Sequence, residues 1–339
     1  MNSASSGIGQ DCATGLGPRQ GLRLTAENAS AYLEERGWPG AREAVIEPLG
    51  GGVSNTVLLA STANGRIVCK QALEKLRVKA DWRSRADRTL READAIQAIA
   101  PLLPPGAVPK IVFIDRPNCI YAMEAAPHTA TDWKTALLRG QADPAIAAAA
   151  GRILGGMIRA TFQNPEWEQR FGDQTVFDEL RLDPYYRFTA ERHPDCAAHF
   201  NSLLDSRRVS LVHGDWSPKN ILVAGDVVTA IDFEVVHYGD PCFDTGFLLC
   251  HLLLKSIYLP GHATDFQRCA AAFWEALDLQ NEWIWPGTAA HLGGLLLARA
   301  DGKSPAEYLN EAERDELRRL AKRLIVRPAK SIEELWQCR

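Results

Sequence analysis

The pattern of apolar residues changes character near residue 124. Before that point, short strand-like runs separated by glycine turns occupy residues 44–70, and two more follow at 110–115 and 119–124. After it, long helical patterns such as residues 144–163 dominate, and strand signals return only around residues 210–230. An antiparallel meander followed by a helical region predicts an α+β fold with two lobes, a small antiparallel-sheet N-lobe and a larger helical C-lobe.

The chain divides accordingly into three parts. Residues 1–22 are rich in Ser, Gly, Ala and Thr, and we expect them to form a flexible leader. Residues 23–124 form the predicted N-lobe. Apolar residues recur at helical spacing over 24–37 and predict a first helix with Thr25 as its N-cap, and a charged helix is predicted at 83–100. Residues 125–339 form the predicted helical C-lobe.

Length and charge narrow the class of protein. The 339 residues suffice for about two domains. With 38 basic and 42 acidic side chains the net charge is −4, which argues against a nucleic-acid or anionic-membrane partner and favours a small molecule. No apolar run reaches the ~20 residues of a membrane span. The eight cysteines form no C-x-x-C pair, so we expect reduced thiols and a cytoplasmic location.

The densest set of polar residues is H-G-D-W-S-P-K-N at 213–220, followed by a strand–turn–strand pattern and by I-D-F-E at 231–234. Asn220 and Asp232 offer amide and carboxylate oxygens, which suit Mg²⁺. Asp215 is then free to orient a hydroxyl group and to accept its proton late in phosphoryl transfer. Each residue alone fits an ordinary turn or strand end, but their joint occurrence at fixed offsets predicts a reactive site.

These motifs resemble the aminoglycoside phosphotransferase and choline kinase superfamily, small-molecule kinases with a protein-kinase-like fold. The resemblance covers about residues 24–309 and includes Y-G-D-P-C-F-D at 238–244. It implies that Asp215 is the catalytic base, that Asn220 and Asp232 hold metal ions, and that Asp244 supports the catalytic loop. The implied cofactors are ATP and Mg²⁺, and the implied reaction phosphorylates a hydroxyl group of a small metabolite.

A glycine run between two predicted strands supplies the first part of a nucleotide site. Glycine permits close approach of backbone N–H groups to phosphates, although a plain hairpin turn explains the run equally simply. The residues concerned are Gly50, Gly51, Gly52, Ser54 and Asn55.

The rest of the predicted nucleotide site lies on the following elements. Lys70 ends an apolar strand and is expected to bind the α- and β-phosphates. The resemblance implies that Glu92 pairs with Lys70, the alternative being a solvated acid beside Arg88. Residues 121–126 are similar to a kinase hinge, in which backbone groups of Glu124 and Ala126 bind adenine.

One subgroup of the superfamily is locally similar. K-Q-A-L at 70–73 and D-F-E at 232–234 are similar to methylthioribose kinases, although residues 297–303 lack the tryptophan and tandem arginines of their substrate site. The similarity implies that Glu234 is a second acidic group near the metals or the sugar.

Residues 180–188 and the late helical region carry candidate substrate groups. Arg181, Tyr185 and Arg299 could bind a sugar or a small anion, but a helix face that packs its tyrosines explains the pattern equally well. The neighbouring candidates are Asp183, Tyr186, Arg187 and Asp301. The remaining histidines are expected in the core or on the surface rather than as ligands; they include His128, His237, His251 and His291.

The acceptor is the least determined part of the prediction. Residues 125–339 carry 23 basic and 29 acidic side chains, and the arginines of the candidate segments offset the acids there. This balance favours a sugar-like acceptor, neutral or mildly anionic, over a polycationic aminoglycoside. An aminoglycoside-type antibiotic phosphotransferase and a catalytically silent nucleotide-binding module remain the alternatives. A protein kinase is disfavoured, because no A-P-E arrangement follows the D-F-E segment.

Overall fold

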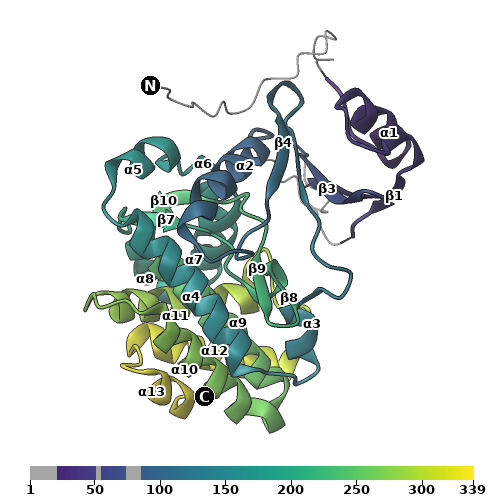
Figure 1. The fold of residues 1–339 in the computed structure, drawn as a ribbon. Coiled ribbons are helices and arrows are strands. Elements are labelled where there is room, and N and C mark those ends of the chain that lie inside the picture. The colour runs from purple at the N-terminus through teal and green to yellow at the C-terminus, as the bar shows by residue number, and fades with distance from the viewer. Residues whose placement is uncertain (1–20, 51–54, 74–84) are drawn as a thin grey trace, which may run out of the picture.

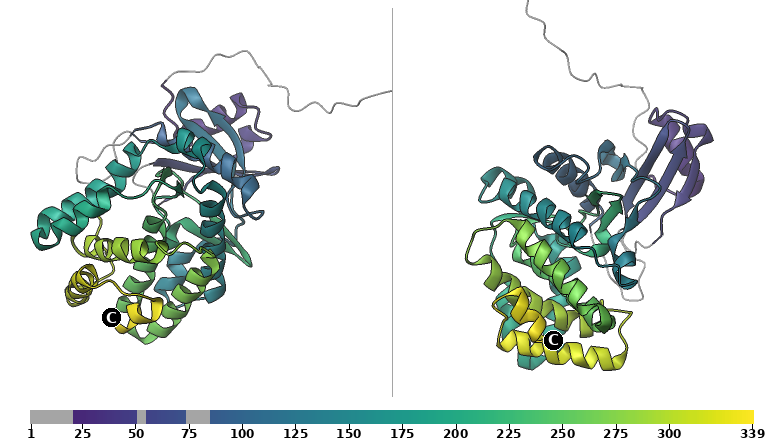
Figure 2. Two further views of the ribbon diagram at one scale, coloured as in Figure 1. Left: turned by 90° about the vertical axis from the view of Figure 1, so that its left-hand side faces the viewer. Right: turned by 60° about the horizontal axis from the view of Figure 1, so that its bottom comes forward.

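The chain is described by a computed structural model that places residues 21–50, 55–73 and 85–339. A sheet built from the N-terminal part lies beside and above a mass of helices built from the C-terminal part (Figure 1). Figure 2 shows the molecule from two further directions, and in both views the sheet is distinct from the helices. The predicted α+β fold, with its sheet-rich N-terminal and helical C-terminal regions, is confirmed.

The N-terminal sheet has five strands in the order β1-β2-β3-β5-β4, and every neighbouring pair is antiparallel. Alternate residues of β2 and β3, such as Leu58 and Ile67, are buried in a small core that also receives Leu33 from helix α1. All five strands fall where the sequence predicted strands. Their bounds are β1 Val45–Pro48, β2 Asn55–Thr62, β3 Gly65–Ala72, β4 Ile111–Asp115 and β5 Ile120–Glu124.

Two helices accompany this sheet. Helix α1 (Ala26–Glu35) begins after Thr25, whose backbone N–H donates to Asn28 Oδ1 at 2.8 Å. Helix α2 (Arg88–Ile99) packs against β3, β4 and β5. Of the predicted leader, residues 1–20 lie outside the described residues, whereas Leu22 is already bonded to the sheet, since its carbonyl accepts from Gln71 Nε2 at 2.8 Å.

The C-terminal lobe encloses the main hydrophobic core. Helix α4 approaches α10 closely, because Cβ atoms at Gly151 and Gly155 would lie 2.4 and 2.0 Å from α10 carbonyl oxygens. Helix α9 packs against both α10 and α11. The helices are α3 Trp133–Leu138, α4 Pro144–Thr161, α5 Pro165–Phe171, α6 Thr175–Phe177, α7 Phe188–Arg192, α8 Ala197–Leu204, α9 Cys242–Tyr258, α10 Ala263–Leu277, α11 Ile284–Asp301, α12 Glu311–Val326 and α13 Ile332–Gln337.

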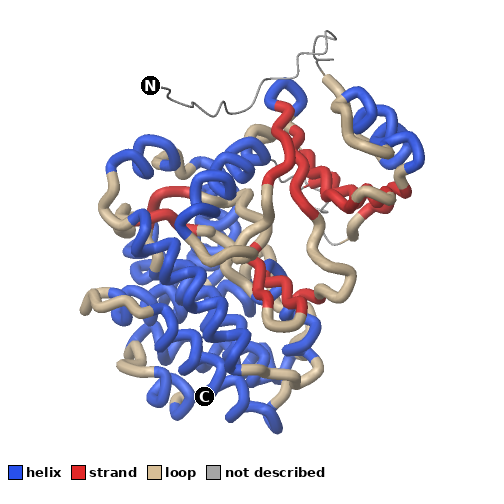
Figure 3. The backbone as a smooth tube through the Cα atoms, in the orientation of Figure 1, coloured by secondary structure: helices blue, strands red, loops and turns tan. Residues whose placement is uncertain are grey.

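Short strands, red in Figure 3, lie between the helices. β7 (Ser210–Val212) pairs with β10 (His237–Gly239), and β8 (Ile221–Ala224) pairs with both β9 (Val227–Ala230) and β6 (Thr131–Asp132). Strands β7 and β10 lie at the two ends of the segment 213–236, and β8 and β9 lie within it. β6, β10 and the π-helical segment Asp178–Arg187 had no counterpart in the sequence prediction.

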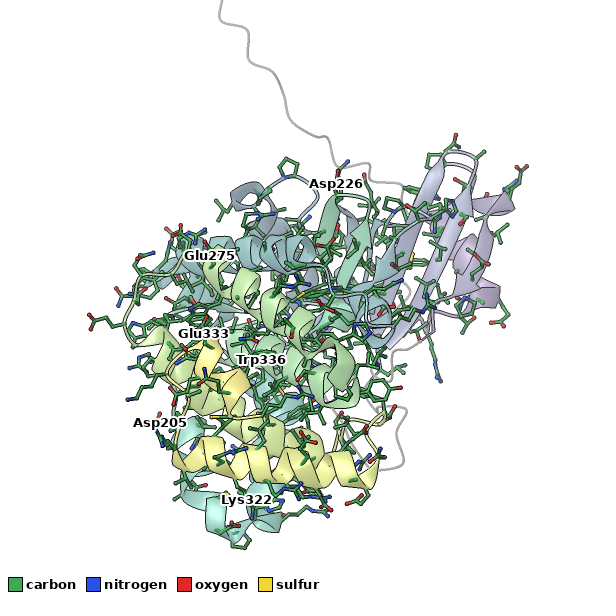
Figure 4. The ribbon with its side chains drawn as sticks, turned by 90° about the horizontal axis from the view of Figure 1, so that it is seen from below. Asp205, Asp226, Glu275, Lys322, Glu333 and Trp336 are labelled. Carbon is green, nitrogen blue, oxygen red and sulfur yellow. The ribbon has the colours of Figure 1, made fainter. Side chains whose placement is uncertain are left out.

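The C-terminal helices close the far end of this lobe. In Figure 4, Trp336 of α13 is labelled; its indole Nε1 donates to the Ala263 carbonyl of α10 at 3.1 Å. Lys322 of α12 pairs with Asp195 at 2.7 Å on the surface. Within the described ranges no single helix has the length and apolar composition to cross a membrane, and α4 and α5 meet that test only as a pair bent by 105°.

Candidate active site

The loop that carries Asp215 follows β7 and is fixed by its backbone. Gly214 has a φ of +77°, and a Cβ atom there would lie 2.8 Å from the Val235 carbonyl oxygen, so the position requires glycine. Asp244, in the first turn of α9, accepts hydrogen bonds from the N–H groups of His213 at 2.6 Å and Gly214 at 2.9 Å. The supporting role predicted for Asp244 is therefore confirmed. Burial raises the pKa of its carboxyl to about 7.

Asp215 presents one oxygen to the protein and keeps the other free. Its Oδ2 contacts Lys219 Nζ at 2.9 Å, Asn220 Nδ2 at 2.9 Å and Arg181 Nη2 at 3.0 Å. Oδ1 makes no hydrogen bond with any described residue. Burial opposes ionisation, yet the charges of Arg181 and Lys219 lower the pKa of Asp215 below its ordinary value. The result is an ionised carboxylate with one oxygen available to a reacting hydroxyl group.

Asn220 and Asp232 are held side by side by the hairpin of β8 and β9. The Ile231 N–H donates to the Asn220 carbonyl at 2.9 Å. Asn220 Nδ2 bonds the backbone and side-chain oxygens of Asp215, which leaves its amide oxygen without a hydrogen bond in the described part of the chain. Asp232 adopts a left-handed φ of +68°, a strained conformation of the kind that clusters at functional sites.

This donor set fits a hard divalent cation. One carboxylate and one amide oxygen are typical of Mg²⁺ sites, where phosphate and water oxygens complete the coordination. Asn220 and Asp232 would hold such an ion, as the sequence predicted.

Lys70 lies between the two carboxylates of Glu92 and Asp232. Its Nζ is 2.7 Å from Glu92 Oε2, both side chains are buried, and it also contacts Asp232. Glu92 Oε1 accepts in addition from the Phe233 N–H at 3.0 Å, so α2 is tied to the catalytic segment. Burial opposes the charge of Lys70, but Asp232 and Glu92 raise its pKa well above the ordinary value. The predicted pairing of Lys70 with Glu92 is present.

Glu234 lies at the junction of the two lobes. Its Oε2 accepts from Asn55 Nδ2 at 2.8 Å and from Arg88 Nε at 3.1 Å. It therefore binds the start of β2 and the start of α2 to the segment after β9. The sequence pattern indicates a surface position for Arg88 beside Glu92, yet its side chain is fully buried.

The remaining nucleotide residues are only partly described. Gly51, Gly52 and Ser54 lie outside the described residues, and Gly50 is exposed just before them. Near the hinge, the Glu124 N–H donates to Lys110 at 2.9 Å and the Ala126 carbonyl accepts from Arg66 at 3.2 Å. The Ala126 N–H makes no hydrogen bond within the described part of the chain. The nucleotide contacts of all these residues stay predictions.

Three of the candidate substrate residues form a row that begins at Asp215. The guanidinium of Arg181, which pairs with Asp215, lies 5.9 Å from the ring centroid of Tyr185. The Tyr185 hydroxyl accepts from Arg299 Nη1 at 3.4 Å. The other candidates have separate partners: Asp183 with Lys303, Tyr186 with His291, Arg187 with Asp178, and Asp301 with Arg318.

Sequence analysis missed two groups near this row. Lys219 binds the Asp215 carboxylate and stands inside the motif at 213–220, where its offset of four from Asp215 is the signal. On α9, Phe247, His251 and Lys255 follow one another at intervals of four and therefore share a helix face, a spacing that the sequence displays.

The sequence of the chain is similar to those of known kinases. The sequence profile of the phosphotransferase enzyme family matches residues 45–291. A methylthioribose kinase from Citrobacter koseri is 28% identical over 294 residues, which cover 77% of this chain and 73% of that protein.

Two solved structures share the fold. A choline/ethanolamine kinase family protein from Mesorhizobium loti has a TM-score of 0.51 and 14% identity, with 92% of this chain and 97% of that chain covered. APH(2″)-IIa in its gentamicin complex has a TM-score of 0.51 and 13% identity, with 93% and 99% covered.

These relationships agree with the geometry of the site. The chain is an ATP-dependent kinase of small molecules. With more than half of its length matched, the chain belongs to the phosphotransferase enzyme family.

Proposed function

We propose that the chain transfers the γ-phosphoryl group of ATP to a hydroxyl group of a sugar-like metabolite, with Mg²⁺ as the metal ion and in the cytoplasm. The observation that carries this proposal is the state of Asp215. Three donors hold Oδ2, while Oδ1 makes no hydrogen bond with a described residue. A carboxylate so placed can orient a hydroxyl nucleophile and take its proton late in the transfer.

The other residues position the phosphates and their charge. Lys70 binds the α- and β-phosphates, and Glu92 holds Lys70 in place through the ion pair of 2.7 Å. Asn220 and Asp232 hold the metal ion, which when bound neutralises charge on the phosphate oxygens. Arg181 and Lys219 keep Asp215 ionised. Phosphoryl transfer depends mainly on such positioning and charge neutralisation.

The acceptor end favours a sugar over an aminoglycoside. Tyr185 and Phe247 pack against each other in the interior, with their ring centroids 5.8 Å apart. Arg181 and Arg299 flank Tyr185 with positive charge, which would repel a polycation. Methylthioribose, the substrate named for the relative that is 28% identical, is the first acceptor to test.

A substrate panel coupled to ADP release tests the proposal. We expect turnover of methylthioribose or another pentose and none of kanamycin or gentamicin. Asp215→Asn should abolish turnover, whereas Lys322→Gln, at the surface pair with Asp195, should leave it unchanged. Efficient phosphorylation of the aminoglycosides with none of any sugar would overturn the sugar assignment. Full activity of Asp215→Asn would overturn the role of the base.

A further inference from the structure

The row that starts at Asp215 continues beyond Tyr185 along one face of α9. The rings of Tyr185 and Phe247 are 5.8 Å apart, and those of Phe247 and His251 are 4.9 Å apart. One turn further lies Lys255, which is fully buried. Its ammonium lies 5.7 Å from the ring centroid of Tyr308. A lysine side chain is therefore buried at the far end of the aromatic row.

Lys255 has no carboxylate partner in the described part of the chain. Its one hydrogen bond, of 3.3 Å, goes to the His251 carbonyl of its own helix. The other buried cations behave differently: Lys70 pairs with Glu92, Arg88 with Glu234, and Arg181 with Asp215. A buried charge without a counter-ion is costly, and burial together with the charges of Arg299 and Lys134 lowers the pKa of Lys255 to about 7, so an anion nearby would favour its charged form.

Arg299 adds a second uncompensated cation from the facing helix α11. Its Nη1 donates to Tyr185 Oη at 3.4 Å, to Ser304 Oγ at 3.0 Å and to the Ser304 carbonyl, all of them neutral acceptors. Its Nε is buried and has no hydrogen-bond partner. No described carboxylate lies within ion-pair distance of this guanidinium.

His251 is half-buried, and the charges of both Lys255 and Arg299 act on it. Its imidazole makes no hydrogen bond with a described residue. Burial, followed by the charges of Lys255 and Arg299 and then of Lys219 and Lys134, lowers the pKa of His251 well below its ordinary value. The imidazole is therefore neutral at pH 7 and stands in a strongly positive field.

We propose that His251, Lys255 and Arg299 form a subsite for an acidic group of the acceptor, so that the acceptor is a sugar bearing a carboxylate or a phosphate. This inference rests on the proposed function, whose reacting hydroxyl lies at Asp215, at the other end of the row. An anion at His251 and Arg299 satisfies the free donor of Arg299 and compensates the charge of Lys255 beneath it. A neutral sugar leaves that charge unpaired.

Matched acceptors test the subsite. We expect kcat/KM for ribonate or for ribose 5-phosphate to exceed that for ribose at least tenfold, and the two acids distinguish a carboxylate from a phosphate. Lys255→Met keeps the apolar stem and removes the charge. It should reduce this preference to less than threefold while the KM for ATP stays unchanged. A preference for ribose in the wild type, or an equal loss for all three sugars in the variant, would overturn the subsite.

A second variant avoids any change in the core. Lys134, on α3, is exposed and contributes to the same positive field. Lys134→Gln should raise the KM for the acidic sugars two- to threefold at low salt, and Lys322→Gln should not. Should no sugar yield ADP, the proposed function fails. Calorimetry in the presence of a non-hydrolysable ATP analogue then decides the subsite, because ribonate should bind the wild type and not Lys255→Met, and equal binding or none in both refutes it.

Discussion

Arg181 Nη2 lies 3.0 Å from Asp215 Oδ2, and this ion pair joins the π-helical segment 178–187 to the catalytic loop. The same guanidinium donates to the Gly214 carbonyl at 2.7 Å. Arg181 thus fixes the orientation of the Asp215 carboxylate and favours its ionised form. We assign it as a positioning residue, because it acts through Asp215.

Loss of the Arg181 charge should shift the pH profile of the enzyme. Arg181 lowers the pKa of Asp215, so in Arg181→Met that pKa rises and the acid limb of kcat/KM moves to higher pH. We expect kcat at pH 7 to fall about tenfold, equivalent to ~1.4 kcal/mol in activation free energy. Steady-state kinetics between pH 5 and 9 measure both effects. Arg181→Lys keeps the charge and is the matched control; an acid limb that does not move in Arg181→Met would contradict the role.

The Lys70–Glu92 pair should behave as one unit in kinetics. Glu92→Gln leaves Lys70 without its partner on α2, so we expect the KM for ATP to rise and kcat to fall, with kcat/KM reduced at least tenfold. Lys70→Met should have a similar effect, and the double variant should be no worse than either single one, because residues that share an interaction are not additive. Additive losses would show that the two side chains act separately. Glu43→Gln, an exposed acid, serves as control.

The metal ligands can be tested by titration. Asp232→Asn removes one charged oxygen, so the Mg²⁺ concentration for half-maximal activity should rise at least tenfold. Asp226→Asn, in the exposed turn between β8 and β9 and labelled in Figure 4, should leave the Mg²⁺ requirement unchanged. A chelator should abolish turnover, and added Mg²⁺ should restore it. An unchanged Mg²⁺ requirement in Asp232→Asn would remove this residue from the metal site.

The sequence predicts those features of the structure that are determined by residues close together in the chain. Alternate residues of the N-terminal strands, such as Leu58 and Ala60, face one small core, and the predicted site residues Asp215, Asn220 and Asp232 lie within one hairpin and its approach. Because a hairpin brings such residues together by itself, their proximity could be predicted without knowledge of the tertiary fold.

Contacts between distant segments could not be predicted in this way. Glu234 meets Arg88 across 146 residues, and no local pattern distinguishes a buried arginine from a solvated one on a charged helix. The strand β6 has two residues and forms only because β8 is beside it. The π-helical segment 178–187 contains Pro184, which propensity alone would place at a helix start.

Two glycines with left-handed φ angles allow the energetic cost of the backbone conformation to be measured separately from the cost of a steric clash with an added Cβ atom. Gly214 has a φ of +77° and its added Cβ would lie 2.8 Å from the Val235 carbonyl oxygen, whereas Gly225 has a φ of +58° and open space. Gly225→Ala should lower the free energy of unfolding by about 1–2 kcal/mol, the cost of φ alone. Gly214→Ala should lower it further and also reduce kcat, because the backbone that carries Asp215 must shift. Urea unfolding and kinetics measure the two effects; equal losses in both variants would contradict the close contact.

The buried amine of Lys255 should make the free energy of unfolding depend on pH. Burial, with the charges of Arg299 and Lys134, lowers its pKa to about 7, against about 10.4 for an unfolded lysine. Between these values the unfolded state binds the additional proton, so this group destabilises the fold, and its cost declines by about 1.4 kcal/mol per pH unit as pH rises from 7 to 10.

Lys255→Met should therefore be more stable than the wild type at pH 7, and the difference should shrink towards pH 10. The groups that act on Lys255 from other elements are Arg299, Lys134 and Asp132, and from its own helix Cys250. Since Lys255→Met leaves all of them in place, subtracting the two urea-unfolding curves at each pH isolates the lysine. A difference that stays constant from pH 7 to 10 would mean that Lys255 carries no uncompensated charge, and an acidic acceptor would then have nothing to neutralise there.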